Sequence, residues 1–354
     1  MKKILPTIII IIFLLIIPAA ADNLINQNEL NDAVPDDVLE LIDDDTDISL
    51  KNIFSELKSK AISTFSETER RAVSIIIVAL LCGILNIFDV SEKTPDYIYL
   101  CACAAISVIC IGDMGSYIEK ATDALNELNM FSKAALPAMC TACAACGAVG
   151  SAAAKYAASA LFMDVFITAA QNIIVPLIYT YLAVVIAQTA FDNQSLVGIS
   201  KLLKWGCTSL MTLFTITFTA YMSISSAIAS STDAVATKLT KTAISAALPV
   251  VGGIISDAAS SVVAGAEVIK NTAGVFGLIA VLGICAAPFA IFGINYLVYK
   301  AAAVIVSAFS VPKLSALISG IGSAFGLLLG LLGSCGIFIF ISIMTCIKAV
   351  SIVG

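Results

Sequence analysis

The chain contains no histidine among its 354 residues, and only 12% of its residues are charged. The absence of histidine excludes Ser-His-Asp triads, HExxH zinc sites and histidine proton relays. No G-x-x-x-x-G-K-[ST] sequence is present, so the chain has no recognisable nucleotide-hydrolysis loop. The 19 basic residues are outnumbered by 25 acidic residues, which leaves no broad basic surface for nucleic acid. We therefore expect no enzyme activity, no cofactor and no nucleic-acid partner.

Apolar residues make up 60% of the chain, and the mean hydropathy is +1.02. A soluble domain is about half apolar and about a quarter charged, whereas roughly 20 apolar residues cross a bilayer core. The composition predicts an all-α polytopic membrane protein with about seven transmembrane helices, within a range of six to eight. The expected spans are residues 72–88, 97–112, 134–154, 165–190, 205–229, 275–298 and 314–347. Two further apolar pieces, residues 246–269 and 301–311, could form re-entrant segments or half-helices.

The N-terminus has the order of features of a secretory signal peptide. Two lysines follow Met1, an apolar run covers residues 4–17, and Ala19 and Ala21 form an A-x-A cleavage site. The alternative is an uncleaved first span, for which 14 apolar residues are short. The expected domains are a signal peptide at 1–21, an exported acidic segment at 22–71 and a multi-span membrane domain at 72–354.

The segment after the expected cleavage site is strongly acidic. Residues 22–50 hold ten acidic residues and no Lys or Arg. Residues 50–71 then predict an amphipathic helix, which would either rest on the membrane surface or pack against the chain's own spans. The apolar residues at helical spacing are Ile53, Phe54, Leu57, Ala61, Ile62 and Phe65.

All eleven cysteines lie in apolar segments, where they are expected to act as small, reduced hydrophobic residues. Cys140, Cys143 and Cys146 have the spacing of the first three ligands of a bacterial ferredoxin cluster. The fourth ligand position is occupied by Gly150, however, and no proline follows. We therefore expect no metal site.

Two glycine and proline patterns concern helix packing. Gly322, Gly326 and Gly330 fall four residues apart, and this spacing predicts one helix face suited to close contact, either within the chain or in a dimer. A shift of 112 residues aligns several positions, including Leu-Pro pairs, and indicates a possible internal repeat of 134–245 and 246–354. Paired, interrupted segments of this kind occur in transporters, although chance similarity is an equal alternative.

Charged residues inside apolar segments usually face a polar cavity or a partner. Asp257 and Glu267 lie in a piece rich in Gly, Ala and Ser that follows Pro249. Glu267 precedes Lys270 by one helical turn, a spacing that suits an ion pair. Charges at span ends are expected to extend to water, and these are Lys155, Asp164 and Lys300.

A specific motif occupies the stretch 232–274 and continues to a proline in the next apolar segment. Its residues are Thr232, Asp233, Val235, Lys238, Lys241, the run Pro249-Val250-Val251-Gly252-Gly253, Asp257, Lys270, Asn271, Gly274 and Pro288. This motif resembles that of the stage III sporulation protein AE family of endospore-forming bacteria. The signal peptide, the acidic exported segment and the polytopic C-terminal two-thirds resemble the family in hydropathy and order, so the resemblance covers the whole mature chain.

The resemblance implies a non-catalytic, permease-like component of the complex that the mother cell assembles in the membrane around the forespore. It implies a cytosolic ATPase and a ring-forming protein as partners, and stage II sporulation protein Q as an indirect partner. The complex would be needed for late forespore gene expression. It also implies a multi-pass protein of the mother cell membrane, with its N-terminal segment outside the cytoplasm.

Two other functions are compatible with the residues alone. The possible repeat, Asp257 and Glu267 would suit an autonomous secondary transporter of small solutes. The acidic external segment would suit a structural membrane anchor that recruits partners.

The first prediction concerns the signal peptide. We expect the mature protein to begin at Asp22, because a short apolar run that ends in Ala-x-Ala is a signal-peptidase substrate. N-terminal sequencing of protein purified from a spore-forming host measures this directly. A mature chain that begins at Met1 or Lys2 contradicts it.

Overall fold

The computed structural model describes the chain as a set of helices, and no strand occurs within the described residues. The described ranges are 27–42, 46–87, 94–145, 149–191, 193–247, 252–309 and 311–348. Side chains are described within these ranges except at residues 27–29, 86–87, 94–96, 111–113, 145, 149–151, 194, 226–247, 252–271 and 348. The expected signal peptide with Ala19 and Ala21, and also Pro249, lie outside the described residues.

Five helices are long enough and apolar enough to cross a membrane, as judged over the residues with described side chains. The helices in chain order are α2 (Gln27–Asp32), α3 (Asp36–Leu39), α4 (Thr46–Ile87), α5 (Thr94–Ala145), α6 (Val149–Ala169), η1 (Ala170–Ile174), α7 (Val175–Phe191), α8 (Gln194–Ala247), α9 (Gly252–Ala308) and α10 (Pro312–Lys348). The candidate spans are Tyr97–Ala144, Ala152–Phe191, Ser195–Ser225, Thr272–Ala308 and Pro312–Ile347.

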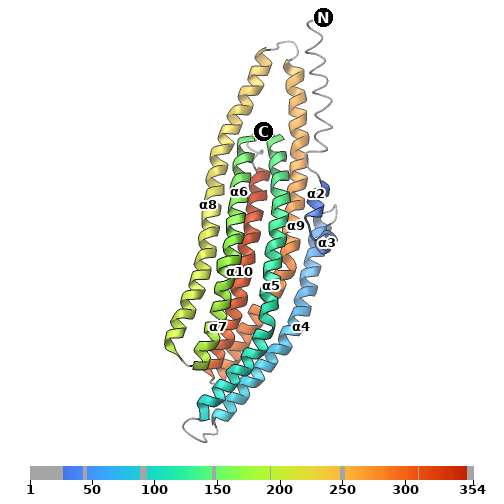
Figure 1. Ribbon diagram of the computed structural model, residues 1–354. Helices are drawn as coiled ribbons and strands as arrows, with labels where there is room; N and C mark the ends of the chain where they lie inside the picture. The colour runs from blue at the N-terminus through green and yellow to red at the C-terminus, as the bar shows by residue number, and fades with distance from the viewer. Residues whose placement is uncertain are drawn as a thin grey trace.

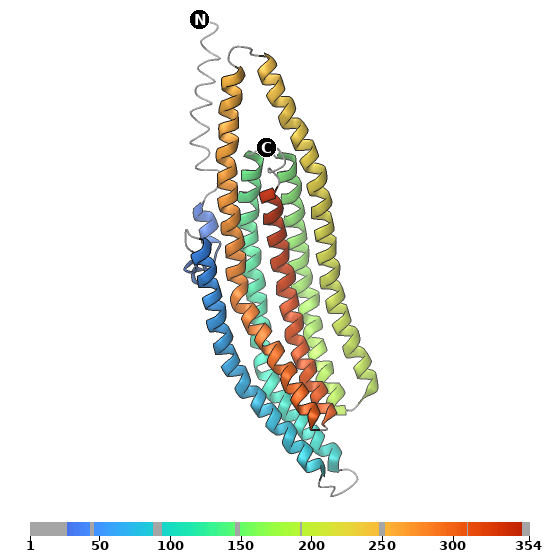
Figure 2. The same ribbon diagram turned by 180° about the vertical axis from the view of Figure 1, so that it is seen from behind.

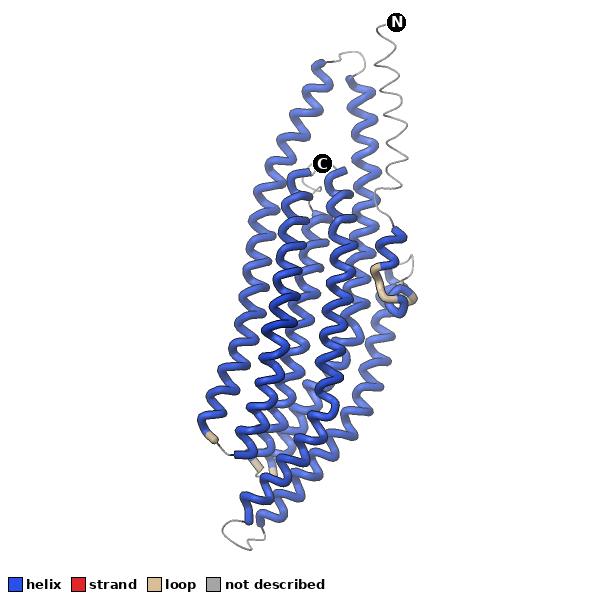
Figure 3. Tube along the Cα trace, in the orientation of Figure 1, coloured by secondary structure: helices blue, strands red, loops and turns tan. Residues whose placement is uncertain are grey.

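The long helices lie side by side along one axis and form a bundle (Figure 1, Figure 3). Helix α10 occupies the centre, because it packs against α9, α5, α8, α7 and α6. Helix α4 lies on the outside, against α9 and α5 (Figure 2). The candidate span in α10 is also the most buried of the five, so the central position of α10 matches its almost uncharged sequence.

The glycine face of α10 brings its backbone close to α9. A Cβ atom added at Gly322 would lie 3.1 Å from Tyr299 Cβ, and one added at Gly326 would lie 3.0 Å from Tyr296 Cδ2. A Cβ added at Gly330 would lie 3.6 Å from the sulfur of Met211 on α8. The face therefore packs within the chain, because glycine lets the helix axes approach where lipid supplies no hydrophobic driving force.

A π-helical turn, η1, joins α6 to α7 without a break in the helical path. Pro176 follows this turn, and a proline removes one backbone donor and clashes with the carbonyl four residues earlier, here that of Asn172. The wider π turn accommodates that clash. The sequence analysis did not anticipate this turn.

The expected count of about seven spans is not confirmed, and two of the expected boundaries are wrong. Residues 134–154 do not form one helix, because α5 ends at Ala145 and α6 begins at Val149. The described part of 246–269 is not a separate half-helix, because α9 is continuous from Gly252 to Ala308. Hydropathy alone shows where apolar stretches lie, but not where one helix ends and the next begins.

The expected amphipathic helix is the first part of α4 and continues without interruption into the apolar residues 72–87. It packs on the bundle through Ile53, which is buried, whereas Phe54 and Ile62 are exposed. The five candidate spans come from residues with described side chains, which in α4 end at Leu85, and α4 is not among them.

The internal repeat remains a prediction. The break between α5 and α6 corresponds, 112 residues later, to a point inside the continuous helix α9. Pro176 and Pro288, which the repeat would align, both lie within helices.

The second prediction tests the contact between α9 and α10. We expect Gly322→Val to lower the free energy of unfolding by about 1–3 kcal/mol, because the new side chain meets the backbone and Cβ of α9. Thermal and denaturant unfolding of the purified protein in a non-ionic detergent measures the change. The matched control is Gly293→Val, since a Cβ at Gly293 would have no atom within 4 Å apart from its chain neighbours and the backbone of its own helix. Equal stability of the two variants contradicts the prediction.

Candidate functional site

The family-like motif lies on two helices that extend beyond the rest of the bundle. The C-terminal part of α8 and the N-terminal part of α9 project past the ends of α5, α6 and α10 (Figure 1, Figure 2). Residues 232–241 belong to this part of α8, and residues 252–271 belong to this part of α9. The described part of the motif is therefore carried by a projecting pair of helices.

The structure does not describe most of the motif's side chains. Gly252 and Gly253 are the first two residues of α9, and the α9 backbone also carries Asp257 and Glu267. Gly274 is the described exception, and it is buried where α9 joins the bundle. A Cβ there would lie 2.6 Å from Ile347 Cδ1 of α10. The motif's positions with undescribed side chains, whose roles remain predictions, are Thr232, Asp233, Lys238, Lys241, Gly252, Gly253, Asp257, Glu267, Lys270 and Asn271.

A buried lysine stabilises the end of α10 at the same end of the bundle. Lys155 is only 1% exposed, and its Nζ donates a hydrogen bond of 2.7 Å to the carbonyl oxygen of Thr345. The Cys143 thiol contacts the carbonyl oxygen of Cys346 at 3.2 Å. The last four carbonyls of a helix have no partner within the helix, so α6 and α5 supply partners for two of them in α10.

The position of Lys155 corrects one expectation from the sequence. We expected this lysine to extend to water from a span end, but the structure buries it against α10. A carbonyl group at a helix C-terminus carries a partial negative charge, which favours a nearby cation. Asp164, by contrast, is exposed as expected, and its carboxylate lies 3.8 Å from Lys133 Nζ.

Two of the three cysteines with ferredoxin-like spacing, Cys140 and Cys143, have described positions. Cys140 and Cys143 lie on α5, and both thiols lie within hydrogen-bonding reach of Cys346 on α10. Cys146 lies outside the described residues. Among the residues with described side chains, no group of three or more His, Cys, Asp or Glu residues has the geometry of a metal site.

A second polar cluster lies near the opposite end of the bundle, where α8 begins and α9 ends. Lys300 Nζ donates hydrogen bonds to the Ser319 carbonyl oxygen at 2.9 Å, to Ser319 Oγ at 2.8 Å and to Ser323 Oγ at 2.9 Å. Lys204 Nζ of α8 donates to the same Ser323 Oγ at 3.2 Å. Two ammonium groups from different helices therefore meet at one buried serine of α10. Lys300 is half-buried, and does not simply extend to water as expected.

Polar contacts at mid-height attach α4 to the bundle. Thr68 Oγ1 donates a 3.2 Å hydrogen bond to Asn295 Oδ1 of α9, and both residues are fully buried. Arg71 donates a 2.6 Å hydrogen bond to the Tyr117 hydroxyl of α5. The Tyr117 ring packs edge-on against Phe325 of α10, with ring centroids 5.1 Å apart. These contacts explain why α4 stays on the bundle although many of its apolar side chains face outward.

The middle of α5 presents a charged outward face. Glu119, Lys120 and Asp123 are exposed there at helical spacing. Asn126 continues this face, and its Oδ1 accepts a 2.8 Å hydrogen bond from Gln171 in the π turn. Hydrocarbon cannot solvate these groups, so this face needs water or a protein partner.

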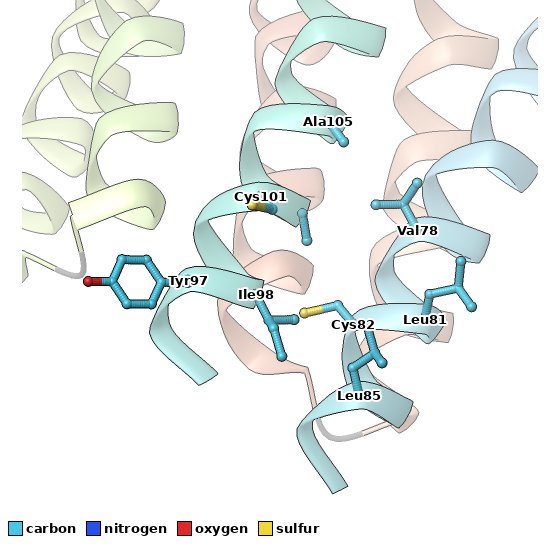
Figure 4. Close-up of a pocket in the computed structure, with 9 residues that line it drawn as sticks. Val78, Leu81, Cys82, Leu85, Tyr97, Ile98, Cys101 and Ala105 are labelled. Atoms are coloured by element: carbon cyan, nitrogen blue, oxygen red, sulfur yellow. The ribbon is translucent and has the colours of Figure 1, made fainter. Parts of the chain in front are cut away.

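An apolar groove lies between the C-terminal part of α4 and the N-terminal part of α5 (Figure 4). Its volume is about 380 Å³. The lining residues are Val78, Leu81, Cys82, Leu85, Tyr97, Ile98, Cys101, Ala102 and Ala105. This lining offers no carboxylate or amine, and its ionisable groups are the thiols of Cys82 and Cys101 and the phenol of Tyr97.

Comparison with known proteins establishes the family. The family model described as stage III sporulation protein AE matches residues 34–350. The chain belongs to the stage III sporulation protein AE family. Stage III sporulation protein AE of Bacillus subtilis (strain 168) is 23% identical to it over 222 residues, which cover 61% of this chain and 55% of the relative. The match thus spans about half of that relative's length, and no solved structure matches the chain.

Membership of the stage III sporulation protein AE family accords with a role in sporulation, and the long apolar helices indicate a membrane protein. The family is not known as an enzyme.

The sequence analysis did not identify Lys204, Ser319 and Ser323, although the sequence holds one signal for the two lysines of this cluster. No Asp or Glu occurs in residues 193–225 or 272–348, so Lys204 and Lys300 meet no carboxylate from the bundle parts of α8, α9 and α10.

The third prediction concerns Lys155. We expect Lys155→Met to lower the free energy of unfolding by about 1.5–3 kcal/mol, because it removes a buried charge-assisted hydrogen bond and leaves the Thr345 carbonyl without this donor. Equilibrium unfolding in detergent gives the value. Lys133→Met is the matched control, since Lys133 is exposed and its ion pair contributes at most about 1 kcal/mol. If both variants unfold at the same denaturant concentration, Lys155 does not stabilise α10.

Proposed function

We propose that the chain is a membrane core component of the stage III sporulation complex between mother cell and forespore, needed for late forespore gene expression. Its proposed location is the mother cell membrane around the forespore. The proposed partners are a cytosolic ATPase and a ring-forming protein, with stage II sporulation protein Q as an indirect partner. Family membership supports the sporulation role, and the shape and charge of the bundle support the role of a subunit.

The observation that carries the subunit role is the charged outward face of α5 at mid-bundle. The α10 span has 36 residues, which corresponds to about 54 Å of helix at 1.5 Å per residue. The hydrocarbon core of a bilayer is only about 30 Å thick, so a large part of the bundle lies outside it. The apolar side chains in that part of the bundle have no lipid around them, and the charged groups on α5 cannot face lipid. Both kinds of surface are therefore better covered by other subunits.

The arrangement of the helices also supports an orientation. Helix α4 begins part-way along the bundle beside α9 and runs away from the projecting parts of α8 and α9 toward the opposite end (Figure 1). If the N-terminal segment is outside the cytoplasm, as a signal peptide requires, the projecting helices face the space between the two membranes. The opposite end then faces the mother cell cytoplasm.

An autonomous secondary transporter is the less favoured alternative. Transporters of that kind place ionisable groups near the membrane midplane to couple ions to the solute. Among the described side chains no Asp or Glu is buried, and the one buried charged residue, Lys155, lies near a bundle end against a helix terminus. A purely structural anchor that recruits partners is the second alternative.

The test of the proposed function measures assembly. Affinity purification of the full chain from sporulating cells should recover the ATPase and the ring-forming protein. We expect Asp123→Lys, which reverses a charge on the outward face of α5, to reduce that recovery about tenfold while the chain remains in the membrane. Glu67→Lys is the matched control, since Glu67 is an exposed acid on α4.

Unchanged recovery with Asp123→Lys excludes the α5 face as the assembly surface. Reconstitution of the purified chain in liposomes separates the two main alternatives. Solute uptake by the chain alone supports the autonomous transporter, and uptake that requires the other subunits supports the proposed complex.

The last prediction of this section concerns the projecting helices. We expect Asp257→Leu and Gly253→Val each to block spore formation while the protein still accumulates in the membrane. Asp164→Leu is the control and should be tolerated, because that carboxylate is exposed and only loosely paired. Counting heat-resistant spores, with immunoblots of the membrane fraction, gives the answer. If both variants sporulate normally, the motif is not a functional site. If the variant protein is missing from the membrane fraction, the substituted residues are needed only for folding.

A further inference from the structure

The ammonium groups of Lys204 and Lys300 lie close together in space. Among the described side chains, no carboxylate lies between them. Both Nζ atoms bind Ser323 Oγ, at 3.2 and 2.9 Å. The two nitrogens therefore lie about 6 Å apart or less, a distance at which like charges repel. An ion pair between Lys133 and Asp164 lies elsewhere, on α5 and α6. An anion from outside the chain would relieve this repulsion.

The serines around the two lysines complete a set of polar groups suited to an anion. Ser323 is buried, and its hydroxyl donates to the Ser319 carbonyl oxygen at 3.0 Å, so its oxygen is left to accept from the lysines. Ser319 Oγ accepts from Lys300 and keeps its own hydroxyl proton as a donor. Lys204 is exposed, which gives the site access from outside the bundle.

The level of the cluster along the bundle matches a membrane surface. Trp205, the chain's single tryptophan, follows Lys204 and is 65% exposed. Exposed tryptophan is enriched at the level of the lipid headgroups. Lys201, which is also exposed, lies one helical turn before Lys204 on α8. Basic groups between transmembrane helices at this level bind the phosphates of anionic lipids.

We propose that Lys204, Lys300, Ser319 and Ser323 form a binding site for a phosphate group, with Lys201 at its rim. The phosphate belongs either to the headgroup of an anionic phospholipid or to free inorganic phosphate. The two ammonium groups neutralise its charge, and the Ser319 hydroxyl supplies a hydrogen bond. Because the site joins α8, α9 and α10, an occupied site also holds these three helices together at this end of the bundle.

The first arm of the test uses the purified full chain in phosphatidylcholine nanodiscs that contain one fifth phosphatidylglycerol. Native mass spectrometry after release of the protein counts the lipids that it retains. We expect phosphatidylglycerol to be retained in preference to phosphatidylcholine. Lys204→Met should weaken this retention about fivefold, and the double variant Lys204→Met/Lys300→Met should abolish it. Lys133→Met, which removes a lysine from the other end of the bundle, should leave retention unchanged.

The second arm measures the thermal unfolding of the chain in non-ionic detergent with inorganic phosphate or with chloride at equal ionic strength. A rise in the unfolding temperature with phosphate, lost in Lys204→Met, identifies free phosphate as the ligand. Selective lipid retention without that rise identifies the lipid headgroup. Lys204 is exposed, so its substitution tests the site without disturbing the core. The proposal is overturned if neither ligand binds selectively, or if Lys204→Met behaves as the unmodified chain does.

Discussion

Close packing between α9 and α10 is the contact on which the other helices of the bundle rely. Apolar side chains gain little from leaving lipid for protein, so helices in a membrane associate through close backbone approach and shape. Gly322 and Gly326 provide that approach, and Tyr296 and Tyr299 of α9 fill the space beside them. The Tyr299 ring then stacks on Phe325, with centroids 5.4 Å apart. With α9 held on one side, α10 can present its other faces to α5, α6, α7 and α8.

The polar residues inside the bundle follow from the need to satisfy backbone groups where water is absent. Lys155 and Cys143 supply partners to the last carbonyls of α10, and Ser159 donates to Ser342 Oγ at 2.8 Å one turn further in. At the other end, Lys300 binds the Ser319 carbonyl. Charged side chains in the described interior thus meet α10 close to its two ends, while its middle is packed by apolar and aromatic groups.

The dimensions of the bundle connect the fold to the proposed role. Lipid alone cannot cover three features of the bundle (Figure 1). Its helices are much longer than a bilayer core, α5 has a charged outward face, and α8 and α9 project past the other helices. They are expected in a subunit whose neighbours complete its surface. A self-contained transporter instead buries its ionisable groups around a central site, and the described side chains of this bundle have no such arrangement.

Composition and local residue order were enough to predict the helical membrane class and the family. A run of apolar residues must be helical in lipid whatever its neighbours are, and the motif between residues 232 and 274 is contiguous. The helix boundaries were not predictable in the same way. One helix ends at Ala145 and the next begins at Val149 inside an apolar run, whereas the residues after Gly252 continue one helix despite their many small residues.

Which polar residues meet, by contrast, depends on long-range packing. Lys155 and Thr345 are 190 positions apart in the chain, and Lys204 and Ser323 are 119 apart. Nothing in the local sequence around Lys155 distinguishes a lysine that extends to water from one that binds the end of another helix. That choice depends on which helix lies beside α6, and it is made by the packing of glycine and aromatic faces around α10.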